Sequence, residues 1–363
     1  MKRLLPGWVK WPQLDVPLLA ALLLLMGFGL VVLYSASGGS METVYRQGAR
    51  IAIGMVALLV LSQVPPHILR LWSPWLYALG IVLLLATWVF GTGRSTSRWL
   101  DLGLFRFQPS EIMKLAVPMM MAWYLHPRRL PPEPMSILVS TVILLVPAIL
   151  IARQPDLGTA LLVAISGCFV LFLSGLRWRV ILGFAAISAA VAPALWYVMK
   201  DYQKQRVLTF LDPESDPLGT GWNIIQSKIA VGSGGILGKG WLNGTQSRLE
   251  FIPERHTDFI LAVLSEEFGL LGVLGVFAAY LFIAGRGLYI STLARSTYPR
   301  LLAGSLSLTF FVYVLVNAGM VSGLLPVVGV PLPLISYGGT SIVTLLAGFG
   351  ILMSIYGHRN FIR

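Results

Sequence analysis

Long apolar blocks, separated by short polar or proline- and glycine-rich stretches, dominate the chain. Ten blocks are candidates for crossing a bilayer: residues 16–35, 49–64, 75–91, 109–125, 135–152, 157–175, 178–199, 259–285, 301–325 and 338–357. In lipid each backbone donor and acceptor must be satisfied within its own segment, and the blocks lack the alternation of barrel strands. The pattern therefore predicts an all-α, polytopic membrane protein with about ten transmembrane helices.

The first block resembles a secretion signal, because three basic residues precede it and the small residues 35–37 follow it. Its apolar run, 16–32, is longer than the usual signal core of about 7–15 residues, and further spans come after it. We expect a retained first helix and a single integral membrane domain over residues 1–363.

Composition excludes a soluble globule. Hydrophobic residues make up 56% of the 363 residues and charged residues only 12%, against about 25% charged in soluble domains. Cys168 is the one cysteine and the four histidines are scattered, so a disulfide framework and a zinc site of ordinary ligand spacing are excluded.

Charge is distributed unevenly between the two sides of the predicted bundle. The side that carries both termini holds 13 of the 27 basic residues but two of the 15 acidic ones, which predicts that both termini are cytoplasmic. The loop 200–258 has seven of each sign and is expected outside, as is the loop 92–108. Because the net charge of +12 is spread over short loops, we expect membrane lipids and no nucleic acid as partners.

The 59-residue loop 200–258 is too apolar to be disordered. Residues 222–231 have apolar positions at helical spacing. We predict a large structured extracellular loop that forms a lid or a groove wall.

The fourth block begins with Gln108, Pro109, Ser110 and Glu111, and Lys114 follows one turn later. Proline in the first turn and a carboxylate near the positive end of the helix dipole are consistent with simple capping. Lys114 favours function, because ionisable residues within the membrane are costly and usually functional. At a spacing of three residues, Lys114 and Glu111 can form a pair.

Arg94, Arg98 and Arg106 lie in the loop that leads into this helix. A guanidinium fork matches phosphate geometry, so these side chains could form an anion-binding collar. Snorkelling of the same side chains to lipid headgroups is an equal alternative.

Asp258 stands where the long loop returns to the membrane. Its ordinary role there would be to cap the next helix. Its position also suits contact with a lipid-borne substrate, with a pKa tuned by partial burial. The proline- and glycine-rich segment 323–341 is interpreted as a cavity wall rather than a turn, since irregular backbone at membrane depth needs shielding.

Six stretches in chain order closely resemble motifs of the SEDS family, and within it of the RodA branch. They are QPSEIMK at 108–114, QPDLGT at 154–159, GWNIIQS at 221–227, GKGW at 238–241, FIPERHTD at 251–258 and the segment 323–341. The resemblance covers residues 14–357.

The resemblance implies a peptidoglycan glycosyltransferase of the bacterial inner membrane that polymerises lipid II during cell-wall elongation. It implies a class B penicillin-binding protein as transpeptidase partner, within the elongation machinery. The family's essential aspartate corresponds to Asp258, and its important membrane glutamate and lysine correspond to Glu111 and Lys114.

This chemistry is an inverting displacement of the polyprenyl diphosphate. Asp258 is expected to act either as the general base or as a ligand of Mg²⁺ or Mn²⁺, and the sequence leaves both roles open. The departing diphosphate needs cations. The predicted substrate-binding residues are Glu111, Lys114, Arg94, Arg98, Gln108, Ser110 and Lys239.

Two other functions fit parts of the pattern. A flippase for the same lipid would also carry intramembrane charges and broken helices, but it needs polar groups along its whole path. A non-catalytic scaffold for the transpeptidase gives no reason for Lys114 in a membrane helix.

Overall fold

Each of the ten predicted blocks coincides with a helix in the computed structural model. The structure describes residues 14–91, 98–101, 106–199, 201–215, 220–248 and 254–359. The ten helices are α1 (Val16–Ala36), α2 (Met41–Gln63), α3 (Pro66–Phe90), α4 (Pro109–Leu125), α5 (Pro134–Arg153), α6 (Leu157–Leu173), α7 (Trp178–Val198), α11 (Ile260–Leu293), α12 (Thr297–Val321) and α13 (Thr340–Gly357).

Seven of these helices, α1, α2, α3, α5, α11, α12 and α13, are long and apolar enough to cross a membrane. Helices α4 and α6 have 17 residues each. The prediction of an all-α, polytopic membrane protein is confirmed. Within the described residues, one short antiparallel ladder departs from it, between β1 (Leu100–Asp101) and β2 (Arg106–Phe107).

Several predicted helix ends were wrong. Helix α2 begins at Met41 instead of residue 49, α3 begins at Pro66 instead of 75, and α11 ends at Leu293 instead of 285. Hydropathy marks the lipid-buried stretch, whereas a helix continues for as long as its end groups find partners. At the start of α2, for example, the Ser40 hydroxyl accepts from the Thr43 amide at 3.3 Å.

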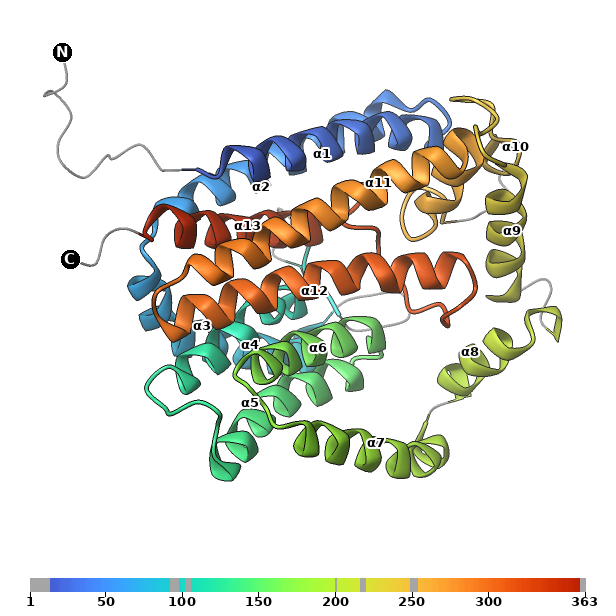
Figure 1. Ribbon diagram of the computed structural model, residues 1–363. Helices are drawn as coiled ribbons and strands as arrows, with labels where there is room; N and C mark the ends of the chain where they lie inside the picture. The colour runs from blue at the N-terminus through green and yellow to red at the C-terminus, as the bar shows by residue number, and fades with distance from the viewer. Residues whose placement is uncertain are drawn as a thin grey trace, which may run out of the picture.

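The long loop is structured, as predicted, and the stretch 222–231 that has helical spacing lies in a helix. It contains α8 (Asp201–Leu211), the 3₁₀ turn η1 (Pro213–Ser215), α9 (Thr220–Ser233) and α10 (Thr245–Arg248). Figure 1 shows α9 lying across one end of α11 and α12. The Ser227 hydroxyl donates to the carbonyl of Val321 at 2.9 Å, which ties α9 to the end of α12.

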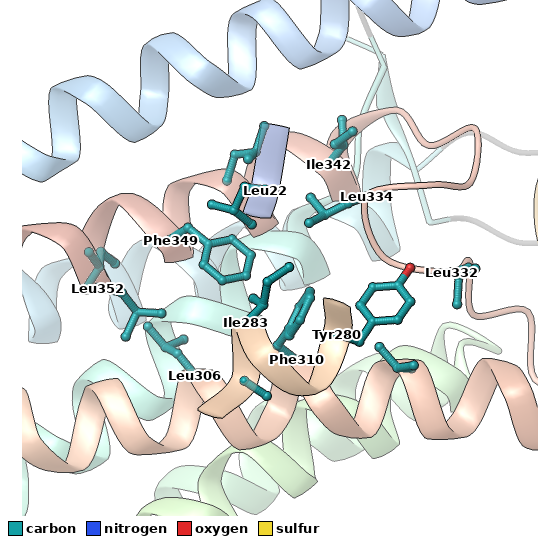
Figure 2. Packing of buried hydrophobic residues seen from close by; sticks show 14 of the residues in the cluster. Leu22, Tyr280, Ile283, Leu306, Phe310, Leu332, Leu334, Ile342, Phe349 and Leu352 are labelled. Atoms are coloured by element: carbon teal, nitrogen blue, oxygen red, sulfur yellow. The ribbon is translucent and has the colours of Figure 1, made fainter. Parts of the chain in front are cut away.

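The start of α1 and the end of α13 lie at the same end of the bundle (Figure 1). Helices α1, α11, α12 and α13 enclose the core that Figure 2 shows, whereas α7 lies apart from it. In this core the Phe310 ring is 5.8 Å from Tyr280 and 5.0 Å from Phe349, between ring centroids. The Tyr280 hydroxyl donates to the carbonyl of Pro333 at 2.6 Å, so the core also anchors the irregular segment between α12 and α13.

Helices α2 and α13 approach closely through a glycine. A Cβ on Gly350 would lie 2.7 Å from the carbonyl oxygen of Leu58. Small residues permit such contacts between membrane helices, where van der Waals packing replaces the hydrophobic effect as the driving force.

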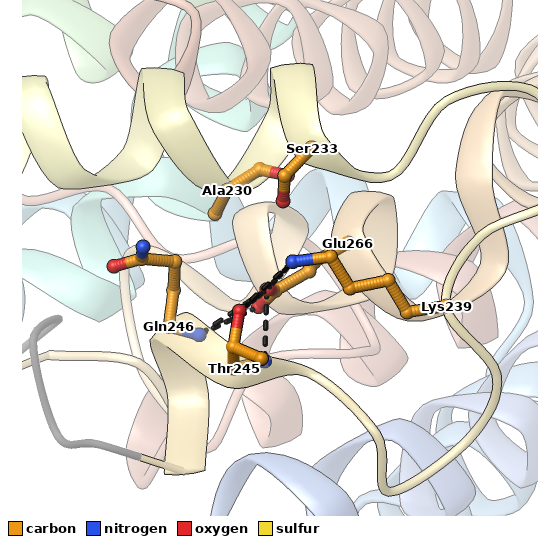
Figure 3. A network of polar contacts seen from close by, with 6 residues as sticks. All are labelled: Ala230, Ser233, Lys239, Thr245, Gln246 and Glu266. Carbon is orange, nitrogen blue, oxygen red and sulfur yellow. Dashed lines mark hydrogen bonds and ion pairs between the residues drawn. The ribbon is translucent and has the colours of Figure 1, made fainter.

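The part of the loop before α10 is held against a break in α11. Glu266 is fully buried and its carboxylate accepts from Lys239 Nζ at 2.7 Å, from the Thr245 amide at 2.9 Å and from the Gln246 amide at 3.1 Å (Figure 3). Three residues further, Gly269 adopts φ 64° and ψ −164°, a conformation essentially restricted to glycine. The backbone amides of Lys239 and of the next residue donate to the carbonyls at 266 and 267.

Candidate active site

A cavity of about 240 Å³ opens at one end of the bundle. The starts of α4, α6 and α13, the turn 254–259 before α11 and the segment 329–339 surround it. Its ionisable and amide lining consists of Arg98, Gln108, Glu111, Lys114, Asp156, Asp258, Tyr313 and Tyr337. Five of the predicted site residues therefore share one cavity.

Asp258 does not cap α11. The N-cap residue of this helix is Phe259, and the helix has no side-chain capping hydrogen bond. The Asp258 backbone is fixed from α12: the Asn317 side-chain amide donates to the carbonyls of Asp258 at 2.8 Å and of Val330 at 2.7 Å. Gly329 lies beside the carboxylate, since a Cβ on Gly329 would be 3.5 Å from Asp258 Oδ2. The aspartate is thus held at the cavity, and the capping interpretation is wrong.

The same turn is tied to the segment before α13. The Ser336 hydroxyl donates to the carbonyl of Thr257 at 2.6 Å and accepts from the Leu332 amide at 2.8 Å. The Tyr337 amide donates to the carbonyl of His256 at 2.9 Å. The proline- and glycine-rich segment is therefore a wall of the cavity, as its composition indicated.

Burial raises the pKa of Asp258 to about 6, and the negative charge of Glu254 adds to the shift. The positive charge of Arg206 on α8 acts in the opposite direction. A carboxyl with a pKa of about 6 is mostly ionised near neutral pH and still a stronger base than an exposed aspartate. This combination suits a general base.

Glu111 and Lys114 form the predicted ion pair, with 2.6 Å between Oε1 and Nζ. Both are largely buried, with side chains 6% and 12% exposed. The ammonium also lies over the Tyr313 ring, 5.1 Å from its centroid, in the range of a cation–π contact. The second oxygen of Glu111 is buried without a hydrogen bond to the described part of the chain.

Arg98 faces the cavity, and its partners belong to the protein. Its Nε donates to the carbonyl of Gln154 at 3.2 Å, and Nη1 is 3.8 Å from Asp156 Oδ1. Gln108 Nε2 donates to the other Asp156 oxygen at 2.8 Å. These contacts argue against lipid snorkelling for Arg98, and its part in an anion-binding collar stays a prediction. Arg94 lies outside the described residues.

Two predicted substrate ligands lie apart from this cavity. Ser110 is buried but is not part of the lining. Lys239 is paired with Glu266, in the set of contacts that holds the long loop against the break in α11. To bind a substrate diphosphate, Lys239 would have to leave the fully buried carboxylate of Glu266, which costs free energy because the charge would remain buried and unpaired. Its role in substrate binding stays a prediction.

Sequence reasoning missed Asp156, Tyr313 and Asn317 as parts of the site. Asp156 did carry a signal, since it stands in the QPDLGT motif; its Oδ1 caps α6 by accepting from the Thr159 amide at 3.2 Å. Tyr313 and Asn317 lie inside an apolar helix. Only tertiary packing brings Tyr313 to the cavity and Asn317 to the backbone of Asp258.

The described residues contain no cluster of three or more histidine, cysteine or acidic side chains that would hold a metal by themselves. Mg²⁺ is commonly bound by one or two carboxylates together with water and substrate phosphates. A single carboxylate at Asp258 fits that mode, in which a diphosphate substrate would supply the remaining oxygens.

The model of the FtsW/RodA/SpoVE family of cell cycle proteins matches residues 16–360. The chain belongs to this family. Peptidoglycan glycosyltransferase MrdB of Escherichia coli (strain K12) is 54% identical over 350 residues, which cover 96% of this chain and 95% of that protein. A probable peptidoglycan glycosyltransferase FtsW of Trichlorobacter lovleyi is 35% identical, with coverage of 94% and 93%.

Solved structures of family members share the fold. One similar chain comes from a solved structure on the structural coordination of polymerization and crosslinking by a peptidoglycan synthase complex. It superposes on this protein with a TM-score of 0.85, at 32% identity, over 97% of this chain and all of that one. The rod shape determining protein RodA of Thermus thermophilus gives a TM-score of 0.73 at 26% identity, over 96% and 99%. The resemblance seen in the motifs is confirmed, and the chain is an integral inner-membrane protein.

Proposed function

We infer that this FtsW/RodA/SpoVE family member is a peptidoglycan glycosyltransferase, and we propose that it polymerises lipid II with Asp258 as the general base. The observation that carries the proposal is one cavity, at one end of a membrane bundle, that is lined by both Asp258 and the buried Glu111–Lys114 pair. A base and a cation are the two groups that displacement of a diphosphate by a sugar hydroxyl requires.

The reaction joins two sugars. The acceptor hydroxyl attacks the anomeric carbon of the donor, Asp258 takes the hydroxyl proton, and the bond to the polyprenyl diphosphate breaks with inversion. A positioned base contributes about 10²–10⁴-fold to such a step. Asn317 holds the backbone of Asp258 in place, so the carboxylate needs little reorganisation.

Lys114 is the group proposed to bind the departing diphosphate. Its side chain is fixed by Glu111 and Tyr313, and its charge lies in a largely buried site, where electrostatic interactions are stronger than in water. Arg98 lines the same cavity and adds a second cation. In the alternative role, Asp258 would hold a divalent cation, Mg²⁺ or Mn²⁺, in place of acting as the free base, and that cation would neutralise charge on the diphosphate.

The substrate side of the bundle is proposed to be extracytoplasmic. Helices α8, α9 and α10 of the long loop lie at the cavity end, whereas the start of α1 and the end of α13 lie at the other. The excess of basic residues at the terminal end supports a cytoplasmic placement there. A class B penicillin-binding protein is proposed as the crosslinking partner, in keeping with the synthase complex to which this fold is similar.

The interior between the two ends favours a polymerase over a flippase. Beyond the Lys114 layer the core is largely apolar, with side chains such as Leu306, Phe310 and Phe349 (Figure 2), and the buried polar residues of this part of α12, Ser305, Ser307 and Thr309, carry no charge. A path for a charged headgroup needs polar lining throughout.

The purified chain in liposomes that contain lipid II and no other polymerase tests the proposal. We expect labelled glycan strands to form. Gel electrophoresis should resolve them, and treatment with a muramidase should remove them. A protein that moves lipid II between leaflets in a parallel accessibility assay but makes no strands, with or without the transpeptidase partner, would contradict it.

A further inference from the structure

Helix α2 buries only a narrow strip of its surface. The buried residues are Gln47, Gly54, Leu58 and Ser62, and the strip faces α13, where Gly350 approaches the backbone of Leu58. Gln47 is 1% exposed and is the longest polar side chain of the strip. An amide buried in a membrane helix costs free energy unless its donor and its acceptor both find partners. The partners of Gln47 therefore explain why an amide stands there.

Both ends of the Gln47 amide bond to the backbone of the irregular segment between α12 and α13. Nε2 donates to the carbonyl of Ser336 at 3.0 Å, and Oε1 accepts from the Gly338 amide at 3.4 Å. The guanidinium of Arg50, one turn further along α2, lies over the Tyr337 ring, 4.3 Å from its centroid. Three consecutive residues of the segment are thus held from α2.

The same segment bonds to the turn before α11. The Ser336 hydroxyl donates to the carbonyl of Thr257, and the Tyr337 amide donates to the carbonyl of His256. The rings of Tyr337 and His256 also pack edge to face, with 5.9 Å between their centroids. The segment therefore connects α2 to the two residues that precede Asp258.

Gln47 itself does not reach the cavity that contains Asp258. It is not part of the lining, whereas Tyr337 and Gly338 are. An effect of Gln47 on the reaction must therefore pass through the segment that it holds. On the other side, Asn317 of α12 fixes the carbonyl of Asp258, so the turn is held between α12 and a segment that is anchored on α2.

We propose that Gln47 is a positioning residue for Asp258 and acts through the segment 336–338. The inference rests on the proposed function, because positioning matters only if Asp258 takes part in the reaction, as base or as metal ligand. Irregular backbone at membrane depth needs partners for its polar groups, and one amide that bonds both a carbonyl and an N–H fixes this segment at two points. Misplacement of a catalytic group by about 1 Å can cost 10²-fold in rate.

Gln47→Leu tests the proposal, since leucine is similar in volume, suits a membrane helix and makes neither bond. In strand synthesis from lipid II, kcat should fall about tenfold or more. KM should stay within about twofold of the wild type, as for a residue that does not bind the substrate. Hydrogen–deuterium exchange of the purified chain without substrate should become about tenfold faster in peptides that contain residues 254–259 and 332–338.

Ser354→Ala is the matched control. The Ser354 hydroxyl is fully buried and donates to the carbonyl of Val64, so it joins α13 to α2 at the end away from Asp258. This variant and Gln47→Leu should both lower the melting temperature. Only Gln47→Leu should change kcat and the exchange of residues 254–259, which separates positioning from a general loss of stability.

Arg50→Met keeps the test valid if Gln47→Leu fails to fold. Methionine retains an apolar stem but loses the cation–π contact with Tyr337. Because such a contact is weaker than two buried hydrogen bonds, kcat and exchange should change in the same direction by about two- to threefold.

Exchange of residues 254–259 that stays at the wild-type rate in Gln47→Leu, or that rises equally in Ser354→Ala, would overturn the proposal. Faster exchange with unchanged kcat would also overturn it, as would a rise in KM alone, which indicates direct binding of the substrate. If the wild type makes no strands, the proposed function fails, and the exchange measurement still decides whether Gln47 holds the turn.

Discussion

The candidate-site residues that the sequence revealed are those whose charge costs free energy at their position in the membrane protein. Lys114 in an apolar helix and Asp258 at the membrane boundary stood out because an unpaired charge there is unfavourable. Asn317 and Tyr313 are compatible with any buried helix, so no pattern marks them. Their importance arises only when α12 packs against the turn before α11.

The raised pKa of Asp258 predicts how activity depends on pH. Only the ionised carboxylate accepts a proton, so kcat/KM should fall as pH drops below about 6 and level off above it. Because Glu254 contributes to the shift, Glu254→Gln should move the inflection to lower pH. Initial rates of strand synthesis over a pH series measure both; an unmoved inflection in Glu254→Gln, or none near pH 6, would contradict this assignment.

Helices were predictable as elements, whereas their ends and breaks were not. Each of the ten apolar blocks located a helix, but none predicted the extension of α11 to Leu293, and the break at Gly269 depends on contacts with the loop before α10. Those contacts join residues about 30 positions apart. Local hydropathy holds no information about them.

The break at Gly269 predicts a selective glycine requirement. A Cβ there would lie 2.3 Å from the amide nitrogen of Gly238, in a backbone conformation that costs other residues about 1–3 kcal/mol. Gly269→Ala should therefore lower the melting temperature in detergent and expose the segment 234–248 to protease. Gly275→Ala, in the same helix with open space around it, should be neutral or stabilising by up to about 1 kcal/mol. Equal stability of the two variants would refute the claim that the close contact at Gly269 holds the loop against α11.

At the scale of the whole molecule, the chain is polarised between two ends. The cavity that contains Asp258 and helices α8 to α10 occupy one end, the start of α1, the end of α13 and the cavity beside Arg70 and His126 occupy the other, and a largely apolar core separates them. Charge counts predicted this polarity, since basic residues cluster on the terminal side. The shape of each cavity could not be predicted, because each is built from four or more segments distant in sequence.

Cysteine labelling tests the orientation. In a background with Cys168→Ala, a membrane-impermeant maleimide should label Glu254→Cys in intact spheroplasts. Arg128→Cys should react only after permeabilisation. Both positions are exposed, so accessibility reports the side of the membrane. The reverse pattern would place the catalytic cavity in the cytoplasm and contradict the proposed orientation.

Strand synthesis from lipid II by reconstituted Asp258→Asn, compared with Glu254→Gln, tests the central claim most directly. The account predicts that Asp258→Asn loses at least about 10²-fold in rate. Its melting temperature above pH 6 should be unchanged or higher, because ionisation of a carboxyl with a raised pKa opposes folding. Glu254→Gln should retain near-normal activity above pH 6. Polymerisation by Asp258→Asn at a rate close to that of the wild type would contradict the account.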